Sequence, residues 1–110
     1  MVMVILLEQN HMETTNSRKP ETIRIALVED DKTVREGLMM LLQGSQGFSC
    51  VAAYASGEEA LAGLPEMKPD VVLMDINLPG INGIECILTL KALNLPMLFI
   101  MLTKIGRAHV

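Results

Sequence analysis

The chain has 110 residues, a length that favours one domain and argues against two. Half of the residues are apolar and 20% are charged, which excludes disorder as the overall state. The formal net charge of −4 disfavours a protein whose main task is to coat nucleic acid or an anionic membrane, because both need a basic face. The two cysteines, Cys50 and Cys86, match no zinc pattern and are interpreted as small buried hydrophobes.

Residues 1–22 are predicted to form a flexible leader. Residues 1–7 are apolar, but they lack the preceding basic residues and the small-residue cleavage site of a signal peptide. Residues 8–22 are polar and show no apolar periodicity. Because no apolar run reaches the roughly 20 residues of a membrane span, we expect a cytoplasmic protein that does not enter a membrane.

From residue 23 onward, apolar strands alternate with amphipathic helices. Strands are predicted at 23–28, 48–55, 71–74 and 96–102, and helices at 32–43, from about 57 to 64, and from about 84 onward. Pro65 is expected to end the second helix. Consecutive apolar residues in the strands indicate a parallel sheet covered on both faces, and right-handed crossovers make this α/β sheet doubly wound.

Helix boundaries carry recognisable capping residues. Asp31 is predicted to cap the first helix, and Gly44 to end it. Ser56 and Glu59 have the spacing of a capping box at the start of the second helix. Apart from that contact, Glu58 and Glu59 are interpreted as a solvated helix face.

Acidic and hydroxyl residues follow the strands directly. Glu29 and Asp30 come after the first strand, Asp75 after the third, and Thr103 after the fourth. In open parallel sheets, ligands bind at the carboxyl ends of the strands. If the first and third strands are neighbours, their carboxylates converge on one small crevice.

Carboxylates brought so close repel one another unless a cation lies among them, and oxygen-only ligands suit Mg²⁺. An aspartate beside Mg²⁺ is also a competent nucleophile toward a phosphoryl group. These residues therefore favour a Mg²⁺-dependent site at which Asp75 receives a phosphoryl group. Taken singly, Asp31 fits a helix cap and Asp75 fits a turn residue. The joint placement of Glu29, Asp30 and Asp75 directly after apolar strands favours the metal site.

Three segments carry a family likeness. Residues 25–31 and 69–83 resemble the receiver domain of bacterial two-component response regulators, and residues 96–103 resemble the fourth strand of that domain. In detail, the sequence of these segments is most similar to regulators with a C-terminal helix-turn-helix of the LuxR type. The likeness implies a flavodoxin-like fold with strand order 2-1-3-4 and with the fifth strand missing.

The resemblance also implies a role for each site residue. Asp75 would be the phosphoacceptor, and Glu29 and Asp30 would be the acidic pair, with Asp30 as the direct Mg²⁺ ligand. Asn77 would offer its backbone carbonyl to the metal, and Thr103 would be the switch hydroxyl that closes on the phosphoryl group.

The phosphoryl donor implied by the resemblance is a histidine kinase that docks on the first helix near Val34 and Leu38. The receiver would control an output domain, for transcription, that this chain lacks, so contact with DNA would come only through that domain. The chain itself would not be an enzyme.

The likeness covers residues 23–103, which we interpret as a truncated receiver domain. The fourth helix, the fifth strand with its lysine, and the fifth helix are missing, and Lys104 lies on the wrong strand to replace that lysine. Residues 104–110 do not fit the family and are interpreted as an artefact, with a native variable tail as the alternative. Without a fifth strand, the fourth is expected to become an exposed sheet edge, and the chain to be marginally stable and to self-associate.

Two other functions remain open at this stage. One is a phosphohydrolase with an aspartate nucleophile, although such enzymes place a second aspartate two residues later, where this chain has Asn77. The other is a receiver-like interaction module that never takes a phosphoryl group, against which the intact carboxylate set argues.

Overall fold

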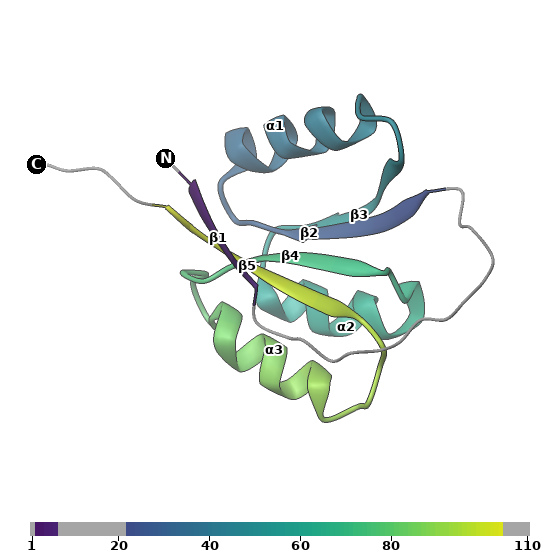
Figure 1. Ribbon diagram of the computed structural model, residues 1–110. Helices are drawn as coiled ribbons and strands as arrows, with labels where there is room; N and C mark the ends of the chain where they lie inside the picture. Colours follow the sequence, from purple (N-terminus) through teal and green to yellow (C-terminus); the bar gives the residue numbers. More distant parts are fainter. Residues whose placement is uncertain (1, 7–21, 105–110) are drawn as a thin grey trace, which may run out of the picture.

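The computed structural model describes residues 2–6 and 22–104, which form a five-stranded sheet flanked by three helices (Figure 1). The strands are β1 (Val2–Leu6), β2 (Ile23–Val28), β3 (Phe48–Tyr54), β4 (Val71–Asp75) and β5 (Leu98–Lys104). The helices are α1 (Lys32–Gln43), α2 (Gly57–Met67) and α3 (Gly83–Lys91). Within the described residues, no helix has both the length and the apolar character needed to span a membrane.

Strands β2 to β5 pair in parallel, and the whole sheet has the order β1-β5-β4-β2-β3. Numbered from residue 23, the four parallel strands have the order 2-1-3-4, which confirms the predicted doubly wound sheet. Helix α1 covers one face of the sheet, whereas α2 and α3 cover the other (Figure 1). The carboxyl ends of β2 and β4 therefore lie side by side at one edge of the molecule.

The main core lies between the sheet and the helices α2 and α3. Alternate residues of the central strands point to this face because side chains along a strand alternate in direction. The core combines buried strand residues, the inner faces of both helices and two loop residues: Ala26, Val28, Val72, Met74, Phe99, Met101, Ala60, Leu64, Cys86, Ile87, Leu90, Leu78 and Met97.

The opposite face of the sheet is covered unevenly. Leu27 pairs with Leu73, and Leu73 with Ile100, so the three form one row across β2, β4 and β5. Leu27 is fully buried, but Leu73 and Ile100 are only half-buried. Helix α1 contacts β2 and β3 and has no fully buried residue. The apolar surface of this face thus becomes more exposed from β2 toward β5.

Strand β1 corrects two predictions. The flexible leader was expected to include residues 2–6, but Val2–Leu6 pairs antiparallel with β5, in a register from Val2–Lys104 to Leu6–Ile100. Within the described residues, β5 is therefore an inner strand rather than an exposed edge. The apolar run at residues 2–6 has the length of a strand, but local composition does not identify its partner, which lies at the far end of the sequence. Residues 1, 7–21 and 105–110 lie outside the described residues.

Two proline positions also differ from the prediction. Helix α2 continues through Pro65 to Met67; the proline lies in the last turn, so the helix extends only two residues beyond the backbone hydrogen bond that the proline removes. Its end is fixed instead by Lys68, which adopts φ 47° and donates its N–H to the carbonyl of Leu64. Strand β5 begins at Leu98 rather than at Pro96, which has no N–H to give to a ladder.

The capping predictions hold for α1 and in part for α2. Asp31 accepts hydrogen bonds from the N–H groups of Thr33, at 2.9 Å, and Val34, at 3.2 Å. Ser56 accepts the N–H of Glu59 at 3.1 Å. The Glu59 carboxylate, however, accepts the N–H of Ala55 at 3.0 Å instead of completing the box at Ser56. Glu59 thus ties the end of β3 to the start of α2.

The two cysteines are expected to differ in reactivity. Burial raises the pKa of the fully buried Cys86 thiol to about 11, assisted by the negative charge of Glu58, whereas Cys50 is half-buried and its pKa is raised less far. A thiol reagent at pH 8 should modify Cys50 first, and Cys86 only as the chain unfolds, as followed by mass spectrometry. Simultaneous modification of both thiols in the folded chain would contradict this assignment.

The raised pKa of Cys86 also predicts a loss of stability in alkali. The unfolded thiol ionises near its ordinary value of 9.0, below the folded value of about 11. The contribution of the protonated Cys86 thiol to the free energy of unfolding is therefore fully present below pH 9 and is lost as the pH rises toward 11. Urea unfolding of the Cys86→Ala variant should show a weaker dependence on pH in this range, and an unchanged dependence would refute the attribution.

Candidate functional site

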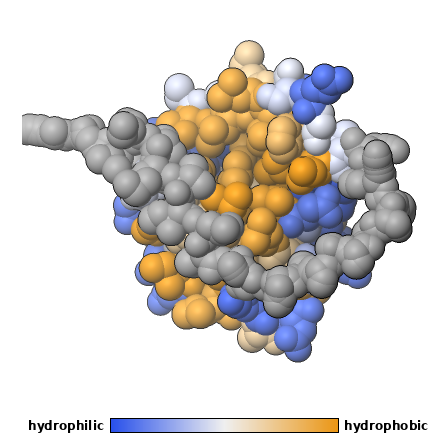
Figure 2. Space-filling model, viewed as in Figure 1, coloured by the Kyte–Doolittle hydropathy of each residue, from blue (hydrophilic) through white to orange (hydrophobic). Residues whose placement is uncertain are grey.

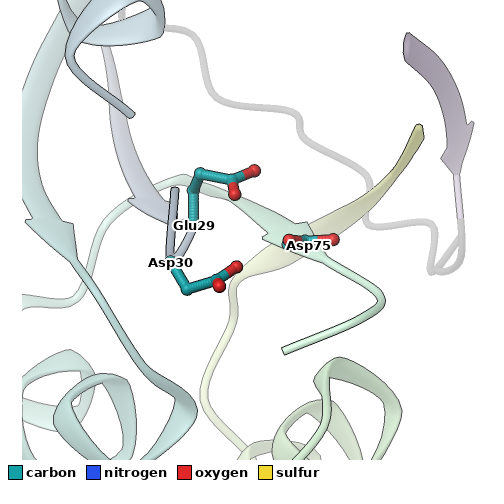
Figure 3. Close-up of side chains that lie close together, drawn as sticks. All are labelled: Glu29, Asp30 and Asp75. Carbon is teal, nitrogen blue, oxygen red and sulfur yellow. The ribbon is translucent and has the colours of Figure 1, made fainter. Parts of the chain in front are cut away.

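Three carboxylates meet at the carboxyl ends of β2 and β4. Glu29 and Asp30 follow β2, and Asp75 is the last residue of β4. One carboxylate oxygen from each residue lies within 4.8 Å of the other two (Figure 3). In Figure 3 the Asp30 side chain points toward Asp75. The predicted convergence of these three side chains is thus confirmed.

The members of this trio differ in their access to solvent. Glu29 and Asp75 are each 1% exposed, whereas Asp30 is exposed. Two buried carboxylates so close together are costly unless hydrogen bonds or a cation compensate their charge. A ligand from solvent would meet Asp30 first and would reach the two buried carboxylates behind it.

The donor set suits a hard divalent cation. All three side chains offer oxygen atoms only, and the trio contains no histidine or thiol that would favour zinc or copper. Mg²⁺ binds through one or two carboxylates and retains several waters. Asp30 is exposed, so this side of the trio is open to solvent, as a Mg²⁺ site with water ligands requires.

The loop after β2 is fixed by backbone contacts. The N–H of Glu29 donates to the carbonyl of Tyr54 at 3.0 Å, and the Glu29 carboxylate accepts the N–H of Asp31 at 3.0 Å. The guanidinium of Arg35, on α1, donates to the carbonyl of Glu29 at 2.9 Å. Glu29 is thus anchored through its N–H, its carbonyl and its carboxylate, and Asp30 follows it in a constrained turn.

The loop after β4 is fixed in a similar way. The N–H of Asn77 donates to Oδ1 of Asp75 at 3.0 Å, so the chain turns back over the carboxylate. The N–H of Ile76 donates to the carbonyl of Leu102 on β5 at 3.0 Å. Gly83 packs so tightly against this turn that an added Cβ would overlap the carbonyl oxygen of Asp75. These contacts orient Asp75 before any ligand arrives.

Thr103 and Asn77 lie near the trio, but their predicted roles stay predictions. Asp75 pairs with Leu102, so Thr103 is one residue further along the neighbouring strand, where it is half-buried. Asn77 is exposed and contacts Asp75 through its backbone N–H. The structure therefore places both at the same edge of the sheet as the three carboxylates.

Sequence reasoning missed how the loop before α3 is held. Glu58, interpreted as a solvated residue, accepts the N–H of Ile81 at 3.1 Å and so ties α2 to the loop after Asp75. Gly80, in the same loop, has φ +74° and lies against the Glu58 carboxylate. Asn82 and Glu85 form a complete capping box at the start of α3. The Asn-x-x-Glu spacing could have revealed the box, but nothing local marks Glu58.

The chain is similar in sequence to curated proteins and in fold to solved structures. The chain is 46% identical over 63 residues to the response regulator GacA of Pseudomonas viridiflava and 43% identical over 63 residues to the transcriptional regulatory protein LnrK of Bacillus subtilis. Each match covers 57% of this chain and 29% of the relative. The chain thus spans less than a third of the length of these curated relatives.

Two solved structures agree in fold. A LuxR-family two-component response regulator from Aurantimonas sp. matches with a TM-score of 0.67 and 37% identity, over 71% of this chain and 56% of that one. A LuxR-family DNA-binding response regulator from Staphylococcus aureus matches with a TM-score of 0.71 and 26% identity, over 77% of this chain and 71% of that one. The family model of the response regulator receiver domain matches residues 25–109. The chain therefore belongs to the response regulator receiver domain family.

Proposed function

We propose that this receiver domain accepts a phosphoryl group on Asp75 with the help of Mg²⁺, and that a histidine kinase supplies the group. The observation that carries the proposal is the convergence of Glu29, Asp30 and Asp75 within 4.8 Å at the carboxyl ends of β2 and β4. Within the trio, Asp75 is held on β4 by strand pairing and its carboxylate is oriented by the N–H of Asn77. An oriented carboxylate is suited to attack phosphorus in line with the departing group.

In the proposed step, a carboxylate oxygen of Asp75 forms a bond to phosphorus as the bond between phosphorus and the donor breaks. The electron pair of the broken bond leaves with the donor, which a histidine kinase would supply as phosphohistidine. The product is an acyl phosphate on Asp75. Thr103, one residue beyond the partner of Asp75 on β5, would donate a hydrogen bond from its hydroxyl to a phosphoryl oxygen.

Mg²⁺ would be held by Glu29, Asp30 and Asp75, with the carbonyl of Asn77 as a further oxygen ligand. When bound, the ion neutralises negative charge that builds up on the phosphoryl oxygens. The carboxylates fit this role because they offer only oxygen donors and because the exposed Asp30 opens the trio to solvent. We propose no hydrolytic role: Asn77 stands two residues after Asp75 and cannot act as a general acid or base.

The partners follow from the same proposal. The kinase would dock on α1, where Val34 and Leu38 are half-buried beside the acidic end of the sheet. The output would be transcription, by way of a DNA-binding domain outside this chain, since several relatives are named as transcriptional or DNA-binding regulators.

The test is to incubate the chain with Mg²⁺ and a small phosphoryl donor such as acetyl phosphate, and to follow the intact mass with time. A slowly hydrolysed adduct of one phosphoryl group, mapped to Asp75, supports the proposal. Rapid release of phosphate over many turnovers would indicate a phosphohydrolase. Absence of any adduct would indicate an interaction module, and an adduct at another residue would refute the assignment of Asp75.

A further inference from the structure

Strand β1 is unlike the rest of the described sheet. It pairs antiparallel with β5, whereas the other described strands pair in parallel, and it lies at the outer edge of the sheet (Figure 1). The register places Met3 opposite Thr103 and Leu6 opposite Ile100. Backbone pairing along β1 therefore satisfies groups of β5 that would otherwise face solvent.

Strand β5 has features that make an open edge hazardous. Residues 98–102 read Leu-Phe-Ile-Met-Leu, with no charge, proline or glycine. Such a segment lacks the charged residues, prolines and bulges that protect natural edges, and it has the composition of segments that pair with copies of themselves. Leu98 and Ile100 are also only half-buried, and hydrophobic residues gather between α1 and α3 on this side of the molecule (Figure 2). An uncovered β5 would thus offer both a hydrogen-bonding edge and apolar side chains.

The antiparallel direction of β1 fits a connection within one chain. Because β1 runs opposite to the parallel strands, it ends, at Leu6, in the direction from which those strands start. Strand β2 begins with Ile23 at that same end of the sheet. Strands β1 and β2 are three strand spacings apart, about 14 Å. Residues 7–22 could reach about 50 Å when extended, so the connection allows closure without strain.

We propose that β1 is a detachable closing strand: it occupies the outer edge of β5 in its own chain, and a second copy of the chain binds that edge when β1 is withdrawn. Because β1 and β5 belong to one chain, β1 binds this edge intramolecularly, whereas a second copy must bind it from solution, and this difference favours β1 at micromolar chain concentrations. The proposal is independent of phosphoryl transfer, because it concerns only the pairing of β1 and β5.

The first experiment uses two neighbouring prolines in the full chain, Met3→Pro and Val4→Pro. Adjacent residues of a strand direct their N–H groups to opposite sides, so one of the two substitutions removes a bond to β5 and the other alters only the outward side. The variant whose proline faces outward is therefore the control for the variant whose proline faces β5, and the two have similar local composition.

We expect one proline variant to lose β1 and the other to retain it. In the first variant, the β5 amides that face β1 should exchange with deuterium at least about tenfold faster, a change of about 1.4 kcal/mol in opening free energy. The β5 amides that face β4 should stay protected, and the variant should form dimers in sedimentation at concentrations where the other variant is monomeric. Unchanged protection in both variants, or monomers throughout, would overturn the proposal.

The second experiment distinguishes β1 of the same chain from β1 of a second copy as the strand that occupies the outer edge of β5. Register partners in an antiparallel pair have Cα atoms about 4.5–5.5 Å apart, within the range of a disulfide, whereas positions two residues out of register do not. In a Cys50→Ser background, Leu6→Cys with Ile100→Cys should oxidise to a crosslinked monomer, and Leu6→Cys with Leu98→Cys should crosslink poorly. Covalent dimers of the first pair would refute closure within one chain, and equal crosslinking of both pairs would refute the register.

Discussion

Replacing Asp75 with Asn is expected to abolish the phosphoryl adduct and to weaken Mg²⁺ binding by about tenfold or more, which corresponds to about 1.4 kcal/mol. The amide has nearly the same shape, so strand β4 and its turn should remain, but it is neutral and a poor nucleophile. Intact-mass measurement after treatment with a small phosphoryl donor, together with Mg²⁺ titration by calorimetry, checks both effects. Equal Mg²⁺ affinity in the variant would remove Asp75 from the metal site.

Asp31→Asn is the matched control. The substitution removes one negative charge from the residue next to Asp30, but Asn caps helices as well as Asp does. The Asp31 side chain binds the N–H groups of Thr33 and Val34 rather than pointing into the trio. Asp31→Asn should therefore keep the adduct on Asp75. Loss of the adduct in this control would mean that net negative charge, not the position of Asp75, governs the reaction.

Replacing Gly83 with Ala is expected to destabilise the fold by about 2 kcal/mol or more, because overpacking of a tight contact forces the backbone to shift. A Cβ there would overlap the carbonyl oxygen of Asp75 and lie 3.1 Å from Cα of Ile76. The strain would fall on the turn that orients the Asp75 carboxylate, so stability and adduct formation should fall together. Urea unfolding and adduct yield measure the two effects.

Gly37→Ala provides a control of opposite sign. Gly37 lies within α1, and a Cβ there would meet nothing within 4 Å. Since Ala is a better helix former than Gly, this variant should gain about 0.5–1 kcal/mol. If both alanines shifted the urea midpoint in the same direction, close packing at Gly83 would not be the cause of its effect.

The sequence alone was sufficient for the parallel sheet and for the carboxylate trio. Both depend on short-range patterns: apolar runs of strand length, and polar residues that follow them directly. Parallel strands bring their carboxyl ends to one edge, so Glu29, Asp30 and Asp75 had to meet once β2 and β4 were neighbours. The cap at Asp31 could be predicted for the same reason, since its partners lie within three residues.

The features that the sequence did not reveal depend on distant partners. Strand β1 pairs with the last described strand, and Glu58 binds the backbone of Ile81, 23 residues away. No local pattern distinguishes such a glutamate from one that faces only water. Pro65 was misread for a different reason: a proline's cost depends on its place within a helix, and the position of that end was itself unknown.

The pairing of β1 with β5 also has a consequence for the order of folding. Among the described elements, residues 2–6 are synthesised before all others, yet their partner, β5, is the last described strand to be synthesised. Contacts between distant segments form slowly because the entropy of closing the intervening chain must be overcome first. During synthesis, residues 2–6 must therefore stay without this partner until β5 has emerged, and this interval is when a chaperone would have the longest access to them.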